Sequence, residues 1–590
     1  MKSFFQNTSN VYLSLVLLAG LLYVNTLGHG FVLDDEAVIL KNQFVRQGTD
    51  GIKDIFLHDS FSGFESAGGG QSILEGGRYR PLSLVFFALI FSFSGENAFP
   101  FHLFNVVLYI VTGLLVFRVL EVMLKDISEP KWISLLTSTL FVVHPAHTEV
   151  VANIKSADEL LSFLFGLLFL LSLLHWFDKK KSIYLWLSPA LLFLACLSKE
   201  SAITLVVTGP LAIWYFRKAD VKKILVLIIP SLIAAIVYLL VRHQILGDQL
   251  SGTIMHDPMN NPFLEWNGNA WVQCEPLVKV ATLLYVFAKY VWLMLIPFPL
   301  THDYYPFHIA LQSFANPMVW IGLIMLILMS YYGIKSLGKK QIAGYGILFF
   351  LISLVPVANL FFPVGTFMAE RFLYLSSFGF ILAITATAIQ RVTEQNRRWL
   401  WWTTSTLIIL FTIITIKRNG AWNSNETLML TDVKVAPNSA KLQLGAGTIL
   451  LNKALQQPVP TEQKKLLQEA LPHLQKSIEL HPTYYDAHLA YGACTYYLQM
   501  YDESVSAYRK MSEQHPNEQK TLTGLRYALE ASGRDKLMKG DTASSILALQ
   551  EAWDIYPDSL IASQLSMIYI DLHQLDSSKV WFDRAQHPTR

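Results

Sequence analysis

The sequence predicts an all-α fold in which a helical bundle with many membrane crossings is followed by a solenoid of helical repeats. Of the 590 residues, 53% are hydrophobic and only 15% are charged, and the mean hydropathy is +0.37. Apolar runs recur through residues 1–430, and from about Ala436 the chain becomes polar, with prolines at regular intervals. A chain this apolar does not fold as a soluble globular protein throughout.

Charge and cysteine content narrow the classes of function. The net charge is only +2, so we expect no nucleic acid as partner. Cys196, Cys274 and Cys494 are too few and too scattered for a disulfide framework or a zinc site. The first apolar run follows Lys2 like a signal peptide, but no small-residue cleavage site follows it. We therefore expect an uncleaved first span and a cytoplasmic N-terminus.

Twelve apolar runs are candidate membrane spans. They are Val11–Leu27, Phe101–Met123, Trp132–Val143, Ala157–Trp176, Ile183–Leu197, Ala202–Phe216, Ile224–Val241, Leu277–Pro297, Pro317–Ile334, Ile342–Phe362, Phe372–Ile389 and Leu400–Ile416. Several fall short of the roughly 18 residues that a span needs, so we expect their ends to extend into the polar connectors.

Basic connectors orient these runs, because lysine and arginine are enriched in cytoplasmic loops. Five connectors are basic: Lys125–Lys131, Lys179–Lys181, Arg217–Lys223, Lys335–Lys340 and Arg391–Arg398. With all five in the cytoplasm, the 28–100 loop and the repeats face outward, and the Leu277–Pro297 run must re-enter or lie in the interface. The orientation leaves 11 crossings.

The long outer loop contains two distinct segments. Arg80 opens an apolar run to Phe93 that is too short to span, and this length indicates an interfacial helix folded over the outer mouth of the bundle. The Gly68–Gly70 stretch before it predicts a mobile connection.

The polar region predicts helical repeats. Pro482 and Pro516 end helices 34 residues apart, which is the period of tetratricopeptide repeats. The packing positions recur as Ala470, Leu474, Ser477; Ser504, Tyr508, Met511; Ser545, Leu549, Ala552; and, in a last unit, Leu565, Tyr569, Ser578, Phe582, Ala585. We therefore predict about four repeats over residues 436–590, with a concave groove for a peptide or partner protein.

Three adjacent carboxylates, Asp34, Asp35 and Glu36, follow the first span and are flanked by apolar residues. Mutual repulsion and desolvation disfavour their charged forms, so at least one should have a raised pKa or a cationic partner. Such a stretch suits a general base or a cation site. A solvated acidic turn that caps a helix is the structural alternative.

Further polar side chains fall on the outward side of the predicted bundle, where ionisable groups usually line a cavity or pair with each other. They are His144, His147, Glu149, Asp158, Lys199, Glu200, Asp303, Glu370 and Arg371. His144 and His147 could instead cap a helix, Lys199 and Glu200 could reach the headgroups, and Glu370–Arg371 could be a structural ion pair. A divalent cation at Asp34, Asp35 and His144 stays open. The sequence has no Walker motif, dinucleotide loop or nucleophile elbow.

Five motifs in order carry a family resemblance: Phe31-Val-Leu-Asp34-Asp35-Glu36, Arg80-Pro-Leu, His144-Pro-Ala-His147-Thr-Glu149 leading to Ser156-Ala-Asp158, Ser198-Lys199-Glu200, and Ala369-Glu370-Arg371-Phe-Leu-Tyr. With the repeats, they resemble the transmembrane and tetratricopeptide repeat containing protein O-mannosyltransferases, which are membrane glycosyltransferases of the C-type (GT-C) fold. The resemblance covers nearly the whole chain and implies a transferase domain over residues 1–430 and a repeat domain over 436–590.

The resemblance also implies an activity, in which a sugar, typically mannose, passes from a polyprenyl or dolichyl phosphate to serine or threonine hydroxyls outside the cytoplasm. The general base then falls on Asp34 or Asp35, and Arg78, Arg80, Lys199 and Arg371 are the cations available for the donor phosphate. The repeat groove would present the acceptor protein. The short repeat array suits a bacterial member in the inner membrane.

Two other functions stay open at this point. A related enzyme would transfer the sugar to a surface glycan or lipid, with the repeats docking an assembly partner. A transporter or a membrane scaffold belongs to a different class, and a transporter is expected to have duplicated halves with interrupted helices. We detect no such duplication in the sequence.

Overall fold

The computed structural model describes residues 7–65, 77–127, 129–217, 219–247 and 258–587, so the Gly68–Gly70 stretch lies outside the described residues. Helices dominate these ranges, which confirms the all-α prediction. One antiparallel hairpin, β1 (Leu264–Trp266) with β2 (Trp271–Gln273), pairs Trp266 with Trp271. The chain forms two compact units, residues 1–305 with 309–435, and residues 306–308 with 436–590.

Eight helices of the first unit are long and apolar enough to cross a membrane, among the described residues. They are α2 (Thr8–Tyr23), α7 (Ala98–Met123), α10 (Ala157–Lys179), α13 (Val221–Leu246), α14 (Pro276–Leu295), α15 (Pro317–Lys339), α17 (Leu373–Arg391) and α18 (Arg397–Asn419). Shorter apolar helices are α6 (Pro81–Ser94), α8 (Pro130–Val143), α11 (Ser182–Ser198), α12 (Leu205–Phe216) and α16 (Ile342–Leu354).

Short helical segments complete the first unit. Those before α6 are η1 (Val24–Gly28), η2 (Glu36–Leu40), α3 (Gln43–Arg46), η3 (Gly48–Gly51), α4 (Ile52–Leu57) and α5 (Ser62–Glu65). Those between the longer helices are η4 (Pro145–His147), α9 (Thr148–Ala152), η5 (Ile154–Ser156), η6 (Glu200–Thr204), η9 (Val355–Val357), η10 (Glu370–Phe372) and η11 (Glu394–Asn396), and η12 (Gly420–Asn423) and α19 (Asn425–Val435) follow α18.

Each of the twelve predicted runs contains one of these helices, and proline at the first helical position begins α6, α8, α14 and α15. The Leu277–Pro297 run forms the continuous helix α14, which has no break at which it could turn back. A re-entrant hairpin needs such a break, and this run has its proline only after the helix has ended, at Pro297. Of the two alternatives predicted for this run, the structure disfavours the re-entrant hairpin, and a position in the interface stays a prediction.

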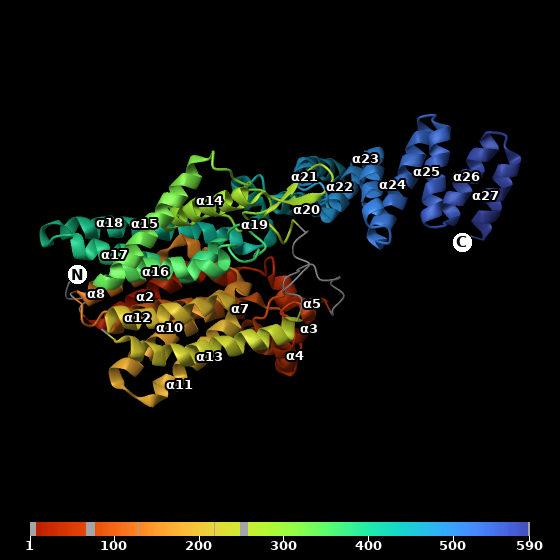
Figure 1. Ribbon diagram of the computed structural model, residues 1–590. Coiled ribbons are helices and arrows are strands. Elements are labelled where there is room, and N and C mark those ends of the chain that lie inside the picture. Colours follow the sequence, from red (N-terminus) through yellow and green to blue (C-terminus); the bar gives the residue numbers. More distant parts are fainter. Residues whose placement is uncertain (1–6, 66–76, 128, 218, 248–257, 588–590) are drawn as a thin grey trace. The chain divides into compact units, whose positions relative to one another are not determined.

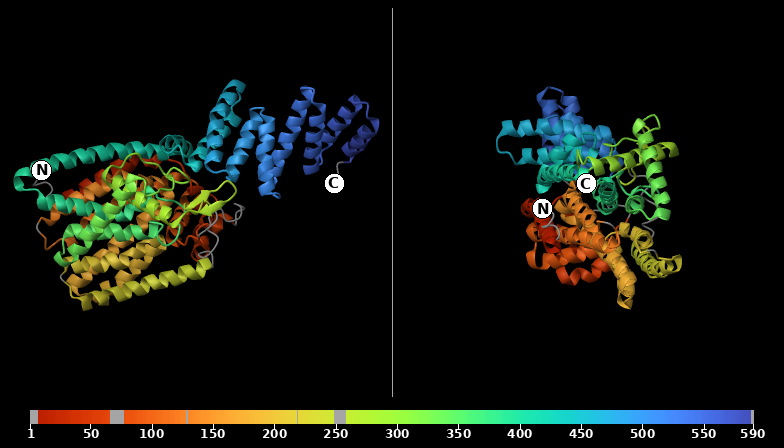
Figure 2. Two further views of the ribbon diagram at one scale, coloured as in Figure 1. Left: turned by 45° about the horizontal axis from the view of Figure 1, so that its top comes forward. Right: turned by 90° about the vertical axis from the view of Figure 1, so that its left-hand side faces the viewer.

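The long helices of the first unit run along a common direction, as α7, α10, α12, α13 and α17 show in Figures 1 and 2. The short elements α3, α4 and α5 lie at one end of this bundle, and the turn between α17 and α18 lies at the other. The loops before α6, which are predicted to face outward, therefore lie at the opposite end of the bundle from the basic connector between α17 and α18.

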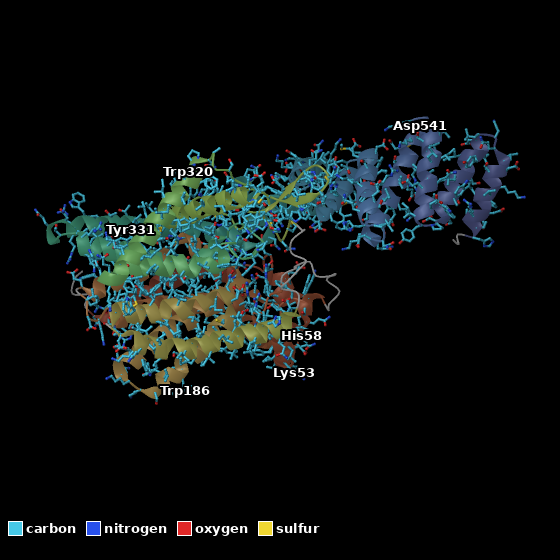
Figure 3. All side chains as sticks on the ribbon, viewed as in Figure 1. Lys53, His58, Trp186, Trp320, Tyr331 and Asp541 are labelled. Carbon is cyan, nitrogen blue, oxygen red and sulfur yellow. The ribbon has the colours of Figure 1, made fainter. Side chains whose placement is uncertain are left out.

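Helix α2 shows how apolar residues divide between the bundle and its surroundings. Val11, Leu15 and Ala19 recur every four residues and are buried. Leu17 and Leu21 are apolar as well, but their side chains are exposed. A helix that is apolar all round is typical of a membrane bundle, because lipid covers the outer face. Trp186, Trp320 and Tyr331 point outward from α11 and α15 in the same way (Figure 3).

The second unit consists of four helical hairpins. Its helices are α20 (Ala440–Gln456), α21 (Pro460–Leu480), α22 (Tyr485–Tyr497), α23 (Tyr501–Gln514), α24 (Gln519–Met538), α25 (Thr542–Ile555), α26 (Ser559–Asp571) and α27 (Leu575–Gln586). The predicted packing positions are buried or partly buried in all four hairpins, apart from Phe582, whose side chain is 55% exposed. A side chain at Gly492 would collide with the ring of Tyr508, so the glycine permits close helix packing.

The predicted orientation can be tested by cysteine labelling, because Cys196, Cys274 and Cys494 are all buried. Met538 in the repeats is 81% exposed, and we expect a Met538→Cys variant to react with a membrane-impermeant maleimide in sealed right-side-out vesicles. Lys181→Cys, in a basic connector, should react only after the vesicles are opened. The reverse pattern would place the repeats in the cytoplasm.

Candidate functional site

The acidic stretch separates into one buried and one accessible aspartate. Asp35 is fully buried, and its carboxylate accepts hydrogen bonds from the backbone N–H groups of Val32 at 2.9 Å and Lys155 at 2.8 Å. Burial raises the pKa of Asp35 to about 7. These contacts tie the loop after α2 to the start of α10, so Asp35 has the position of a structural residue.

Asp34 is more accessible than Asp35. Its side chain is 47% exposed, and its carboxylate lies 3.7 Å from the Lys155 ammonium group. The turn depends on Leu33, which adopts a left-handed φ of 51° and donates its N–H to the Asn425 side chain at 2.8 Å. A non-glycine residue in this conformation is strained, and such strain gathers at functional sites.

Glu36 does not join the other two carboxylates. It begins η2 and pairs with Lys41, and both side chains are more than half exposed. Asp34 is therefore the member of the stretch that is both accessible to solvent and directed toward the buried cations of the bundle end.

These cations and their partners form an ionic cluster at the helix ends of the first unit. Arg80 donates to Asp158 at 2.7 Å and to Glu200 at 2.9 Å. Lys199 pairs with Glu159, and Arg371 pairs with Glu149. Together with Asp34, Lys155 and Arg78, the ionic cluster holds five cations and five carboxylates: Arg78, Arg80, Lys155, Lys199, Arg371 and Asp34, Glu149, Asp158, Glu159, Glu200.

Arg78 differs from the other cations of the ionic cluster. Among the described residues, its guanidinium group makes no ion pair with a carboxylate and lies 5.5 Å from the centre of the Phe61 ring. Burial, followed by the nearby charge of Arg80, lowers the pKa of Arg78. Arg78 is partly exposed, and a cation without a paired carboxylate is the kind of group that binds an anionic ligand.

A pocket opens beside these residues. Arg78, Arg80 and Lys155 line it with a single carboxylate, Asp158, and its remaining walls are largely apolar: Val38, Ser60, Phe61, Ser83, Leu84 and Phe87. The pocket has a volume of about 20 Å³, which is room for about one water molecule. Three cations and one carboxylate in its lining favour a small anionic group.

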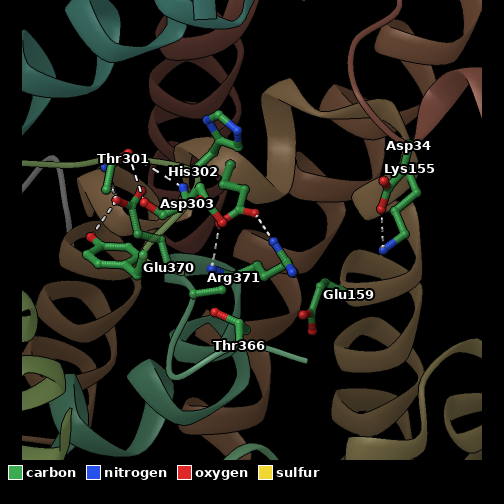
Figure 4. A network of polar contacts seen from close by, with 12 residues as sticks. Asp34, Lys155, Glu159, Thr301, His302, Asp303, Thr366, Glu370 and Arg371 are labelled. Carbon is green, nitrogen blue, oxygen red and sulfur yellow. Dashed lines mark hydrogen bonds and ion pairs between the residues drawn. The ribbon is translucent and has the colours of Figure 1, made fainter. Parts of the chain in front are cut away.

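Glu370 and Asp303 lie in a neighbouring polar group that holds a loop in place. Glu370 accepts from the Thr301 N–H at 2.6 Å and from the Tyr304 hydroxyl at 3.0 Å. In Figure 4, Asp34 and Lys155 lie to one side of Arg371, and Thr301, Asp303 and Glu370 lie to the other. The adjacent Glu370 and Arg371 therefore have different partners, and the structural ion pair considered from the sequence does not form between them.

Asp432 completes this loop contact. It accepts from the backbone N–H of His302 at 2.8 Å and from the Arg418 guanidinium at 2.9 Å. The hydrogen bonds from His302 and Arg418 hold the pKa of the buried Asp432 carboxyl below its usual range. Sequence reasoning missed this network, because His302 and Asp432 are 130 residues apart along the chain.

His144 and His147 lie in the core of the bundle, which differs from the predicted cavity position. His144 contacts the Met294 carbonyl at 3.2 Å, and His147 lies between the Tyr109 hydroxyl at 3.0 Å and Ser377 at 2.9 Å. Both are buried. Within the described ranges, no group of three or more His, Cys, Asp and Glu side chains is arranged to hold a metal ion.

Lys155 is the residue of the ionic cluster that the sequence analysis overlooked most clearly, and Glu159 was not singled out as a site residue either. A lysine between Ile154 and Ser156, directly before a span, carries the same signal of an ionisable group at membrane depth that singled out Lys199. Lys155 belongs to the site because it lies close to Asp34, and the sequence does not give that distance.

The chain is similar to curated proteins named protein O-mannosyl-transferases. It is 26% identical to TMTC3 of Homo sapiens over 579 residues, covering 91% of this chain and 59% of that protein. TMTC2 of Homo sapiens is 28% identical over 502 residues, covering 72% and 58%. TMTC4 of Homo sapiens is 28% identical over 482 residues, covering 72% and 62%. The resemblance predicted from the motifs is therefore confirmed, while the chain spans only about three fifths of these relatives.

Other comparisons add little. No protein-family model matches the chain. The crystal structure of MamA is 16% identical and covers 27% of this chain and 84% of its own, with a TM-score of 0.21. A score this low carries no argument about the fold.

The different roles of Asp35 and Asp34 can be tested by stability. Asp35→Asn loses one of two buried hydrogen bonds, so we expect about 1–3 kcal/mol of destabilisation near pH 5. The raised pKa of Asp35 means that the native state holds its proton between about pH 4 and 7, so wild-type stability falls across that window. The stability of the asparagine variant does not fall in this way. The difference in unfolding free energy between the two proteins should therefore be smaller at pH 8 than at pH 5.

Thermal unfolding of the full chain in detergent measures this difference. Asp34→Asn serves as the matched control, because its side chain is 47% exposed and its loss should change stability by less than about 0.5 kcal/mol. Equal destabilisation by the two substitutions at pH 5 would contradict the assignment of Asp35 as the structural residue.

Proposed function

We propose that the chain is a membrane glycosyltransferase that moves a sugar, mannose in the first instance, from a polyprenyl or dolichyl phosphate to serine or threonine hydroxyls of proteins outside the cytoplasm. The observation that carries this proposal is the accessible Asp34 carboxylate beside a pocket lined by three cations. The names of the curated relatives support it.

In the proposed reaction, the acceptor oxygen attacks the anomeric carbon of the donor while the bond between that carbon and the phosphate oxygen breaks. The bonding electron pair leaves with the phosphate, and the hydroxyl proton passes to Asp34. This single displacement inverts the anomeric centre. An accessible carboxylate is suited to accept that proton.

The leaving lipid phosphate gains one negative charge in this step, so cations near it lower the barrier. Arg78, Arg80 and Lys155 line the pocket, and Arg80 also donates to Asp158. Arg371 and Lys199 are already paired with carboxylates, so we assign them to support of the site.

The second unit offers a place for an acceptor polypeptide. Tyr496, Tyr497, Tyr508 and Tyr527 surround a hollow of about 350 Å³ together with Ala493 and Gly524. None of these lining residues is charged, and Tyr497 and Tyr527 are about half exposed. Aromatic hollows of this kind hold extended peptide segments through stacking and hydroxyl contacts.

The proposal is tested with the purified full chain in lipid nanodiscs, supplied with radiolabelled mannosyl-phospho-undecaprenol, a serine- and threonine-rich polypeptide, and separately a glycan and lipid extract. Label in the polypeptide supports the proposal. Label only in glycan or lipid favours the related enzyme with another acceptor. Failure to consume this donor, its dolichol analogue or the corresponding glucosyl donors would exclude the transferase and leave a transporter or scaffold.

Replacing Asp34 removes the base while keeping its size. General-base catalysis contributes roughly 10² to 10⁴ fold, so Asp34→Asn should lower kcat by that factor and leave the donor Kd within about threefold. Glu36→Gln is the matched control, because Glu36 pairs with Lys41 at the surface, and it should retain wild-type kcat. Near wild-type turnover by Asp34→Asn at saturating donor and acceptor would place the base elsewhere.

The tyrosine hollow gives a separate prediction for the acceptor. Replacing both Tyr497 and Tyr527 with alanine should raise the KM for a polypeptide acceptor about tenfold, since two aromatic contacts are lost, while the donor KM stays unchanged. Phe582→Ala, which removes an aromatic side chain that is 55% exposed on the last repeat helix, is the control. An unchanged acceptor KM in the double variant would show that the hollow does not bind the acceptor.

A further inference from the structure

Lys155 occupies a position between two carboxylates of the ionic cluster. Its ammonium nitrogen lies 3.7 Å from an Asp34 oxygen and 3.8 Å from an Asp158 oxygen, and its side chain is 10% exposed. These separations give electrostatic attraction, but both exceed the usual length of a hydrogen bond. Within the described part of the chain, the ammonium group donates no hydrogen bond.

The Lys155 ammonium group has three donors, and neither carboxylate lies within hydrogen-bond length of it. The group also lines the pocket that contains Arg78 and Arg80. Asp158 already accepts from Arg80 at 2.7 Å, and Asp34 is about half exposed, so neither carboxylate depends on Lys155 alone. An anion entering the pocket would therefore offer Lys155 hydrogen bonds that its present partners do not.

We propose that Lys155 couples donor binding to the basicity of Asp34, by leaving Asp34 and hydrogen-bonding the donor phosphate when the pocket is filled. The inference rests on the proposed function and adds a positioning residue to it. In the empty site, Lys155 stabilises the ionised form of Asp34. In the filled site, that stabilisation is withdrawn, and Asp34 becomes the stronger base when a substrate is present.

The direction of this effect follows from the charges around Asp34. Lys155 faces it from η5, Arg78 acts on it from the segment before α6, Arg371 acts on it from η10, and Asp35 is its neighbour in the chain. Loss of one of three cations disfavours the charged carboxylate and raises its proton affinity.

The test compares two pH profiles of the full chain. The acid limb of kcat/KM for the donor reports the free enzyme, and the acid limb of kcat reports the enzyme with donor bound. Lys155→Met should raise the apparent pKa of the acid limb of kcat/KM by about one pH unit. It should leave the apparent pKa of the acid limb of kcat within about 0.3 unit of the wild-type value. Lys155→Arg keeps the charge and the donors, and it should restore the wild-type profiles.

Three results would overturn the coupling. Equal shifts in the apparent pKa of both acid limbs would mean that Lys155 stays beside Asp34 whether or not the donor is bound. Unchanged limbs with reduced activity would mean that Lys155 acts only in folding or packing. If Lys155→Arg behaves like Lys155→Met, the effect does not come from the positive charge and hydrogen-bond donors that arginine shares with lysine. Lys41→Met, at the surface pair with Glu36, is the control and should leave both limbs unchanged.

A binding measurement separates this inference from the proposed function. Undecaprenyl phosphate alone should bind the Lys155→Met protein about tenfold more weakly than wild type, and the Lys155→Arg protein within about threefold. If wild type neither binds this lipid nor transfers sugar, the proposed function fails and the coupling fails with it. If wild type does both while Lys155→Met keeps wild-type affinity and profiles, only the coupling is wrong.

Discussion

The need to neutralise charge at the end of an apolar bundle governs the architecture of the site. Burying an unpaired ion is far more unfavourable than burying a pair, and Arg80 satisfies Asp158 and Glu200 at once. That contact joins the segment before α6 to the starts of α10 and η6. The pocket exists because these three segments are held at one place while Arg78 and Lys155 are left only partly compensated.

Much of the fold can be predicted from local patterns. Each apolar run correctly predicted a helix, and the spacing of the prolines correctly predicted the repeat helices. Both predictions succeed because each signal lies in residues that are close together in the sequence. Helix α14 is the opposite case. Its place in the membrane was deduced from the charges of distant connectors, and the re-entrant alternative needs a break that the continuous helix Pro276–Leu295 does not have.

The site was predicted less completely than the fold. The sequence marked Asp34 and Asp35 together, but their different exposure depends on the φ of Leu33 and on Asn425, which is 392 residues away. His144 and His147 looked equivalent to Glu149 in the same motif, yet only Glu149 reaches a charged partner. Burial and partner choice are properties of the packed bundle, and short motifs carry no information about them.

The balance of charge within the ionic cluster has a consequence for the medium in which the protein works. Dissolved salt weakens interactions between exposed ions, and the Glu36–Lys41 pair is of this kind. Arg80 with Asp158 and Lys199 with Glu159 are almost entirely enclosed, where counterions do not enter. The geometry around the accessible carboxylate is consequently insulated from changes in ionic strength.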